Sequence, residues 1–173
     1  MIRTQDAIST ARSLIGTPYG EMDCIALIVQ VIRRSSGGVK SYRCQGTNWL
    51  WDSIGNSSKY RHLIWRQEGI AGARSGMLAF KRSGDDIHHV GLVTQKGTVI
   101  HSSSVIGCVV ETELDSSWDL IGQHKHIAVL DEEIAGDDDT DLALSDAKIT
   151  IIDSAGNHFE PVGDWRVLIG SVD

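Results

Sequence analysis

The sequence predicts an α+β domain in which N-terminal helices pack on an antiparallel β meander. Three observations support this fold class. The first 35 residues carry helical apolar stripes and cap signals, and residues 76–130 contain short β-like runs separated by turn signals. With 41% apolar and 23% charged residues in 173, the chain has enough apolar surface for one compact core and is too apolar for a disordered protein.

An amphipathic helix is predicted at residues 4–15. Its apolar side chains recur at helical spacing and form one stripe: Ala7, Ile8, Ala11, Leu14 and Ile15. Gly16 and Pro18 then end the helix.

A second helix is predicted from Cys24 to about Ser35. Asp23 has a side chain suited to an N-cap, and Gly37 and Gly38 follow the expected end. The first half, residues 24–29, is apolar on every side. We therefore expect this helix to be the buried central helix of the domain.

The remaining elements are shorter. Residues 45–70 are irregular and rich in Trp, Ser and Asn, with a short helix expected near residues 47–54. The predicted strands are Met77–Lys81, His89–Thr94, Val99–Ser102, Cys108–Thr112 and Ile127–Leu130. Lys96-Gly97 predicts a hairpin turn between the second and third of these strands, and residues 83–86 predict the loop before them.

Charge divides the chain into three parts: a domain at residues 1–130, an acidic linker at 131–146 and a β appendage at 147–173. The linker contains eight acidic and no basic residues, so we expect it to be solvated. Its aspartates resemble a calcium loop in spacing, but Leu142 replaces the required glycine and Lys148 the required glutamate. In the appendage, strands are expected at residues 149–152 and 166–169.

Composition also bears on partners and compartment. Without the linker the chain is close to neutral, which argues against nucleic-acid binding. The longest apolar run, Ile25–Val29, is too short for a transmembrane helix, and the N-terminus lacks the apolar stretch of a secretion signal. Three cysteines without a CxxC pair argue against a disulfide framework or a cysteine-based zinc site, so neither metal nor organic cofactor is expected.

Three residues form a candidate catalytic relay. Cys24 lies in the first turn of a predicted helix, where backbone N–H groups and the helix dipole should depress its pKa. His89 and His101 lie on neighbouring predicted strands, where one could act as base and the other as its orienter. The alternative is a buried packing cysteine with two half-exposed histidines.

Several linked motifs resemble one family. In order and spacing, Gly16-Thr-Pro-Tyr, Asp23-Cys-Ile-Ala-Leu, Gly76-Met-Leu-Ala-Phe, His89-Val-Gly and Ile100-His are similar to motifs of the NlpC/P60 family of papain-like cysteine peptidases. The resemblance covers about residues 5–130. It implies a papain-like NlpC/P60 fold and a hydrolase, either an endopeptidase or an amidase, that cleaves the stem peptides of bacterial peptidoglycan.

The resemblance also implies roles for individual residues. Cys24 would be the nucleophile, His89 the base and acid, and His101 the orienter. The Tyr19 hydroxyl and the Cys24 backbone N–H would stabilise the oxyanion, and Asp23 would contact a substrate amine. Action at the cell wall without a signal sequence favours delivery by lysis, a phage particle or an unconventional export route.

Departures from the family pattern leave alternatives open. Ile25 and Ala26 replace a Ser-Gly pair, and Met77 replaces an aspartate, which is also what a non-catalytic cell-wall binding module would show. A zinc site built from histidines such as His124 and His126 is a weaker alternative, because no HExxH-like pair is present. Trp49 and Trp51 either pack in the core or line a substrate groove.

Overall fold

A computed structural model describes residues 1–52, 62–129, 151–152 and 158–159 of the chain. The chain divides into two compact units, Met1–Asp137 and Asp138–Asp173. The expected acidic linker at 131–146 and the expected strand at 166–169 lie outside the described residues. In the second unit, the described residues form two short antiparallel strands, β7 (Ile151–Ile152) and β8 (His158–Phe159).

The described residues of the first unit form three helices followed by six strands, as the sequence predicted for an α+β domain. The helices are α1 (Thr4–Arg12), α2 (Cys24–Arg34) and α3 (Thr47–Asp52). The strands are β1 (Leu63–Glu68), β2 (Leu78–Ser83), β3 (Asp86–Val93), β4 (Thr98–Ser103), β5 (Cys108–Glu113) and β6 (Leu120–His124). No helix in the described part of the chain is long and apolar enough to cross a membrane.

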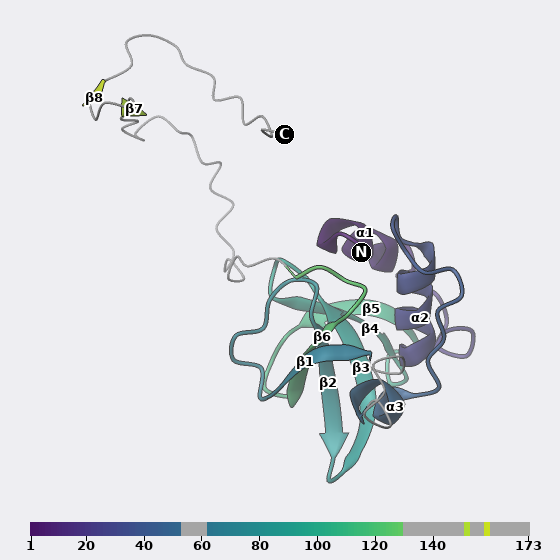
Figure 1. Ribbon diagram of the computed structural model, residues 1–173. Helices are drawn as coiled ribbons and strands as arrows, with labels where there is room; N and C mark the ends of the chain where they lie inside the picture. The colour runs from purple at the N-terminus through teal and green to yellow at the C-terminus, as the bar shows by residue number, and fades with distance from the viewer. Residues whose placement is uncertain (53–61, 130–150, 153–157, 160–173) are drawn as a thin grey trace. The chain divides into compact units, whose positions relative to one another are not determined.

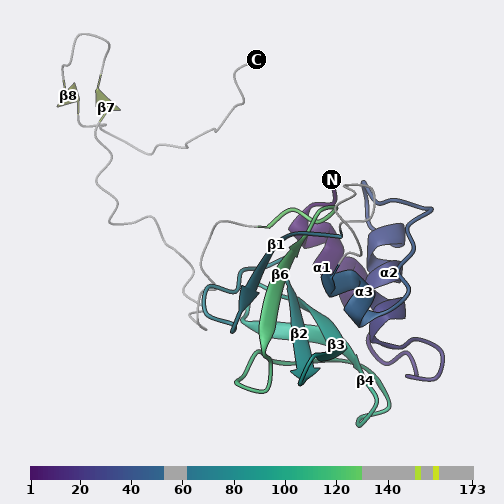
Figure 2. The same cartoon turned by 60° about the horizontal axis from the view of Figure 1, so that its bottom comes forward.

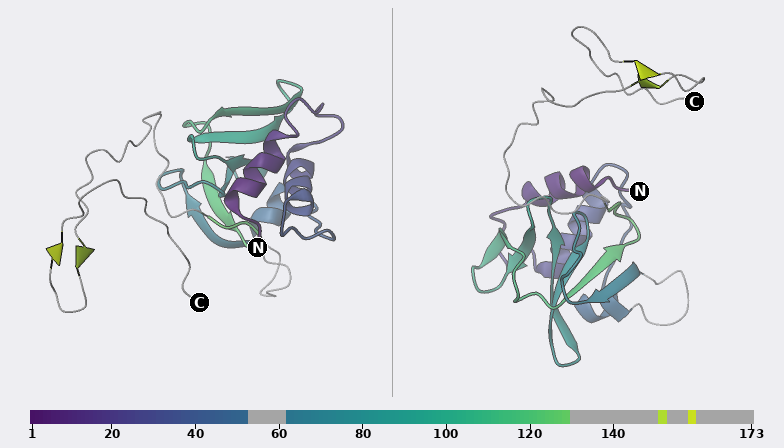
Figure 3. Two further views of the ribbon diagram at one scale, coloured as in Figure 1. Left: turned by 90° about the horizontal axis from the view of Figure 1, so that it is seen from above. Right: turned by 90° about the vertical axis from the view of Figure 1, so that its left-hand side faces the viewer.

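All six strands form one antiparallel sheet in the order β1-β6-β2-β3-β4-β5. The three helices lie on the same side of this sheet (Figures 1 and 2). The sheet is strongly twisted, as its successive strands show in Figure 3. One cluster of buried side chains joins α1 and α2 to the helix side of the sheet, and a second cluster, which includes Val99 and Trp118, lies on its other side.

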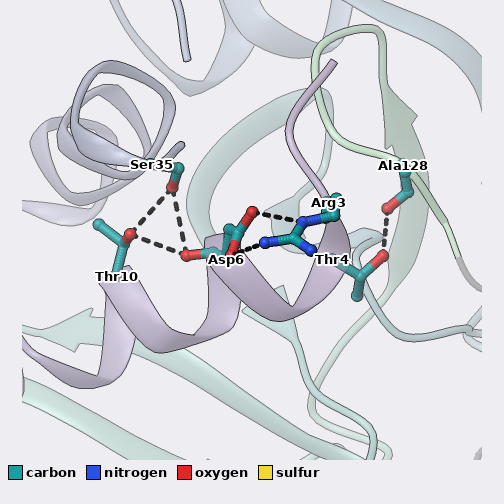
Figure 4. Close-up of polar contacts among 6 residues, drawn as sticks. All are labelled: Arg3, Thr4, Asp6, Thr10, Ser35 and Ala128. Carbon is teal, nitrogen blue, oxygen red and sulfur yellow. Dashed lines mark hydrogen bonds and ion pairs between the residues drawn. The ribbon is translucent and has the colours of Figure 1, made fainter. Parts of the chain in front are cut away.

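Hydrogen bonds hold α1 to its surroundings near both ends of the helix (Figure 4). The Thr4 hydroxyl donates to the carbonyl oxygen of Ala128 at 2.6 Å. The Ser35 hydroxyl, at the end of α2, lies 3.0 Å from the Thr10 hydroxyl and 3.4 Å from the Asp6 carbonyl oxygen. These contacts tie α1 to α2 and to the chain after the last strand of the sheet.

The predicted helices are confirmed with small differences. The first helix ends at Arg12 rather than near residue 15, which leaves Ile15 46% exposed. Asp23 caps α2 as predicted, since its carboxylate accepts the Ala26 N–H at 2.7 Å. However, α2 is fully buried on one side only, and Ile25 and Val29 are partly exposed on the other.

The strand predictions were correct for β2 to β5 and wrong at the ends of the meander. β1 was not predicted as a strand, and the expected strand at Ile127–Leu130 is absent from its described part, where Ile127 only bridges Ile2. The sequence at Gln123 and Lys125 predicts an edge strand, but β6 lies between β1 and β2. Its last residue is His124, so His126 lies beyond the strand.

Candidate active site

Cys24 is the first residue of α2 and is 7% exposed. The Asp23 cap fixes the direction in which the helix begins, and the apolar side chains that follow Cys24 anchor the helix in the core. The backbone N–H groups of Val90 in β3, of Ile25 and of Cys24 itself stabilise the thiolate form of the sulfur. The sulfur therefore lies at the amino end of α2, against the backbone of β3.

His89 and His101 form a directly bonded pair. His89 Nε2 lies 2.8 Å from His101 Nδ1, and the two rings meet edge to face with centroids 4.9 Å apart. The pair joins β3 to β4, because Gly91 lies opposite His101 and His89 precedes Gly91 by two residues on the same strand. The sequence prediction that these two imidazoles share one side of adjacent strands is confirmed.

A β-bulge in β3 directs His89 to its side of the sheet. Lys81 pairs with His89 but the next residue of β2, Arg82, pairs with Ile87, so His88 is an extra residue in β3. Residues two apart on a regular strand share one side. Because of the extra residue, Ile87 packs in the helix-side core while His89 contacts Trp118 on the opposite side.

The sulfur faces the backbone of β3 at a point that β4 does not cover. β3 pairs with β4 only from Gly91 onward, and Val90, whose N–H faces Cys24, lies just before that point. The Val90 nitrogen is bonded to the His89 carbonyl carbon, so the sulfur lies next to the His89 backbone. In His89, Nε2 contacts His101, and Nδ1 is the ring nitrogen nearer to the His89 backbone.

The α3 helix holds the start of β3 in place. The Asn48 side chain accepts the Ile87 N–H at 2.7 Å and donates to the Asp86 carboxylate at 2.7 Å. The Thr47 hydroxyl donates to the Ile87 carbonyl oxygen. These bonds fix the backbone two residues before His89, so α3 contributes to the position of the imidazole pair.

Burial dominates the electrostatics of Cys24. It raises the pKa of the thiol, and the carboxylate of Asp23 raises it further, against the opposing effect of the backbone N–H groups. The expectation from sequence that Cys24 has a depressed pKa was therefore wrong for the resting protein. The helix terminus does favour the thiolate, but the loss of water around a sulfur that is 7% exposed outweighs it.

Burial also keeps both imidazoles neutral. It lowers the pKa of His89 to about 4, aided by the charges of His101 and Lys81, and it lowers the pKa of His101 to about 4. Trp118 packs against both rings, since its ring centroid lies 5.5 Å from that of His89 and 5.4 Å from that of His101. The Lys81 ammonium lies 4.7 Å from the centroid of the same indole.

Tyr19 lies in the loop before α2, and Asp23 is the residue before Cys24. Burial raises the pKa of the Tyr19 phenol, and the charges of Cys24 and Asp23 raise it further. The Tyr19 backbone N–H donates to the Gly107 carbonyl oxygen at 2.8 Å, so the turn after β4 supports this loop.

Trp49 and Trp51 make packing contacts in the structure. The Trp49 ring lies against His62 with centroids 4.4 Å apart, and the Trp51 ring lies against Phe80 with centroids 5.1 Å apart. The Arg66 guanidinium stands over the Trp51 ring at 5.7 Å. Both tryptophans are partly buried, and their contact with a substrate stays a prediction.

Within the described ranges, no three His, Cys, Asp or Glu side chains are arranged to hold a metal ion. The nitrogens of His124, which the zinc alternative would use, are taken by protein groups. Nε2 lies 2.9 Å from the Tyr42 hydroxyl, and Nδ1 accepts the His126 backbone N–H at 3.2 Å.

Two residues at the site were not found from the sequence. Thr112 lies on β5 with its hydroxyl 3.1 Å from His101 Nε2, and Trp118 lies in the connection between β5 and β6. Alternation along the predicted strand at residues 108–112 could have indicated Thr112, because it lies opposite Val99, two residues before His101. No local signal distinguishes Trp118 from the other tryptophans.

A helix that begins at a cysteine, packed on an antiparallel sheet whose adjacent strands carry two imidazoles, defines a papain-like α+β fold. Two solved structures make the fold more specific. The NlpC/p60 domain of the peptidoglycan hydrolase SagA superposes with a TM-score of 0.53 at 20% identity, over 69% of this chain and 97% of that chain. The peptidoglycan hydrolase RipB from Mycobacterium tuberculosis superposes with a TM-score of 0.51 at 19% identity, over 69% of this chain and 63% of that chain.

The chain therefore has the NlpC/P60 fold, as its motifs predicted. A scan of the sequence against protein-family models and a search of curated proteins give no significant match.

Proposed function

We propose that this chain is a cysteine hydrolase, an endopeptidase or amidase, that cleaves amide bonds in peptidoglycan stem peptides. The observation that carries the proposal is the bonded His89–His101 pair, together with a cysteine at a helix terminus whose sulfur faces the N–H of Val90, the residue after His89. The fold supports it, since two solved structures that share the fold, SagA and RipB, are peptidoglycan hydrolases. Such a substrate implies action at the cell wall, and delivery by phage, lysis or unconventional export stays a prediction.

In the proposed mechanism, a neutral thiol and a neutral imidazole react together. As the Cys24 sulfur attacks the substrate carbonyl carbon, its proton passes to His89 Nδ1. His89 is neutral near pH 7 because burial lowers its pKa to about 4, so a ring nitrogen has a lone pair available for the proton. The His101 ring accepts a hydrogen bond from His89 Nε2–H and thereby stabilises the imidazolium that forms.

The oxyanion that develops needs hydrogen-bond donors. The Cys24 backbone N–H and the Tyr19 hydroxyl are the proposed donors, and each such donor contributes about 3 kcal/mol to the stability of the transition state. His89 then gives its proton to the leaving amine and a thioester remains. Water activated by His89 hydrolyses the thioester and regenerates the thiol.

Asp23 and the two tryptophans of α3 are proposed to bind the substrate. One Asp23 oxygen accepts the Ala26 N–H, and the carboxylate also offers an acceptor to a substrate amine next to the scissile bond. The usual Ser that follows the nucleophile in the family is Ile25 here, so recognition of the amine depends on Asp23 alone at this end of the helix.

The proposal is tested by mass spectrometry of fragments released from purified peptidoglycan of several wall types. The unmodified protein should release stem-peptide fragments, and Cys24→Ala should reduce the rate by roughly a thousandfold or more. Cys44→Ala and Cys108→Ala are matched controls and should keep activity. Retention of full hydrolysis by Cys24→Ala would refute the proposal, and binding without hydrolysis by the unmodified protein would identify a non-catalytic binding module instead.

A further inference from the structure

Lys81 lies beside the imidazole pair, on the same side of the sheet. It pairs with His89 across β2 and β3, and directly paired residues share one side of a sheet with their Cβ atoms about 5 Å apart. Trp118 contacts all three side chains, since it packs against both imidazoles and its ring centroid lies 4.7 Å from the Lys81 ammonium. A positive charge therefore stands next to the base of the proposed relay.

Two contacts fix the ammonium in place. Lys81 Nζ donates to the Ser117 hydroxyl oxygen at 2.7 Å, and that hydroxyl donates to the Asp115 carboxylate at 2.5 Å. Because an ammonium only donates and a carboxylate only accepts, the direction of both bonds is determined. The second contact is the face of the Trp118 indole, which attracts a cation.

The ammonium nevertheless has no direct anionic partner. No ion pair in the described part of the chain includes Lys81, and Asp115 is linked to it through Ser117 rather than directly. An ammonium has three N–H donors, and one of them is used by Ser117. Lys81 is also partly exposed. It can therefore donate to a further acceptor that arrives from solvent.

The proposed reaction brings the substrate to this point. His89 gives its proton to the leaving amine, so that amine must come within hydrogen-bond distance of the His89 ring. The residue that supplies the amine then lies next to Lys81, the cross-strand neighbour of His89. An α-amino acid residue that ends a peptide carries its carboxylate on the same carbon atom as its amine. A carboxylate is also the acceptor that forms the strongest hydrogen bonds with an ammonium.

We propose that Lys81 determines specificity by binding a carboxylate of the residue that supplies the leaving amine, a proposal that rests on the proposed cysteine-hydrolase function. Ser117 and Trp118 hold the ammonium before the substrate arrives, which lowers the entropy cost of recognition relative to a free lysine side chain. The preferred substrate is thus a stem peptide in which that residue has a free carboxylate instead of a carboxamide.

Matched peptides test this preference. Stem peptides of two to five residues are synthesised, each with a terminal carboxylate and with a terminal carboxamide. For the peptide that ends one residue after the scissile bond, the unmodified protein should show a kcat/KM about tenfold or more higher with the carboxylate, because a charge-assisted hydrogen bond contributes about that factor.

Three variants assign the preference to one side chain. Lys81→Met keeps most of the length of the side chain without its charge and should abolish the preference, mainly through KM. Lys81→Arg keeps the charge and should retain most of it. Lys96→Met removes an exposed lysine in the turn between β3 and β4, and as the matched control it should keep the full preference.

The ratio of kcat/KM for the two peptide forms is the decisive measurement. The Lys81 charge also lowers the pKa of His89 and of His101, so Lys81→Met changes the relay itself. That effect applies to both peptide forms and cancels in the ratio. Equal kcat/KM for the two forms with the unmodified protein, or an equal loss for both in Lys81→Met, would overturn the inference.

Binding separates this inference from the proposed function. If the protein hydrolyses neither peptidoglycan nor any of the peptides, the hydrolase proposal fails, and calorimetric titration with the same peptides tests Lys81 independently. A higher affinity for the carboxylate forms that is lost in Lys81→Met and kept in Lys96→Met supports the role of Lys81. Equal affinity for the two forms, or a preference that Lys81→Met retains, overturns it.

Discussion

At the scale of single residues, Cys24 shows how burial and helix position compete. Backbone N–H groups at the start of α2 favour the thiolate, yet burial and the neighbouring Asp23 raise the pKa of the thiol. Because His89 also stays neutral down to about pH 4, the resting pair consists of a thiol and an imidazole rather than an ion pair. Ionisation then accompanies attack on the substrate.

This balance predicts the pH dependence of alkylation. The rate of Cys24 modification by iodoacetamide should be low at pH 6 and should rise with a midpoint above about 8.5, the value of an ordinary thiol, because only the thiolate reacts. Mass spectrometry of the Cys24 peptide measures this rate, and the same protein unfolded in urea supplies the reference thiol. Faster alkylation at pH 6 in the folded protein than in urea would contradict the raised pKa.

At the scale of elements, the close approach of β3 and β4 holds the imidazole pair together. Gly91 lies opposite His101, and a side chain at this position would meet the Val99 side chain and come within 2.9 Å of His101 Cβ. Glycine is therefore required here for close packing between strands rather than for an unusual backbone conformation. The His-Val-Gly motif thus places the His89 imidazole two residues before Gly91, and the missing side chain of Gly91 makes room for His101.

Gly91→Ala should therefore separate the two strands. We expect a loss of about 1–3 kcal/mol in the free energy of unfolding and a loss of hydrolysis of about tenfold or more, because His101 must move away from His89. Urea unfolding and the fragment-release assay measure the two effects. Gly46→Ala is the control, since an added Cβ there meets no atom within 4 Å, and equal behaviour of the two variants would count against this account.

At the scale of the whole molecule, a buried polar cluster links the segment after α2 to β1 and β6, which lie at one end of the sheet. The Tyr42 hydroxyl lies 2.9 Å from His62 Nδ1 and 2.9 Å from His124 Nε2. His62 precedes β1, and His124 ends β6. Burial lowers the pKa of His62 to about 4 and that of His124 well below its ordinary value.

These shifts predict the acid stability of the domain. The pKa of these histidines is lower in the folded state than its unfolded value of about 6.5. At pH values below about 6.5 the unfolded chain therefore binds more protons than the folded chain. The contribution to stability is complete above about pH 6.5 and is lost as the pH falls toward about 4, at up to about 1.4 kcal/mol per pH unit for each histidine. His89 and His101 add to the same loss.

Urea unfolding at pH 7.5, 6 and 5 measures this dependence. The double variant His62→Asn, His124→Gln keeps a polar atom near each bonded nitrogen but cannot be protonated, so its stability should fall less steeply with acid. His88→Gln, at an exposed position, is the control and should keep the full slope. An unfolding midpoint that does not change between pH 7.5 and pH 5 would show that the histidines do not control acid stability.

The sequence alone determined the local features of this protein. The apolar stripe of α1, the Asp23 cap of α2 and the Lys96-Gly97 turn depend on residues close together in the chain, and each was predicted correctly. Motif order also indicated the NlpC/P60 fold. Cys24, His89 and His101 could be chosen as candidates because their residue types and expected elements are themselves local properties.

Only the tertiary structure decided the features that depend on distant segments. Whether β6 lies inside the sheet and residues 127–129 outside it depends on pairing with β1 and β2, which are remote in sequence. The contacts of Trp118 and Thr112 with the imidazoles have the same origin. The sign of the Cys24 pKa shift followed from how completely the fold removes water from the sulfur, and solvent exposure is set by all packed segments together.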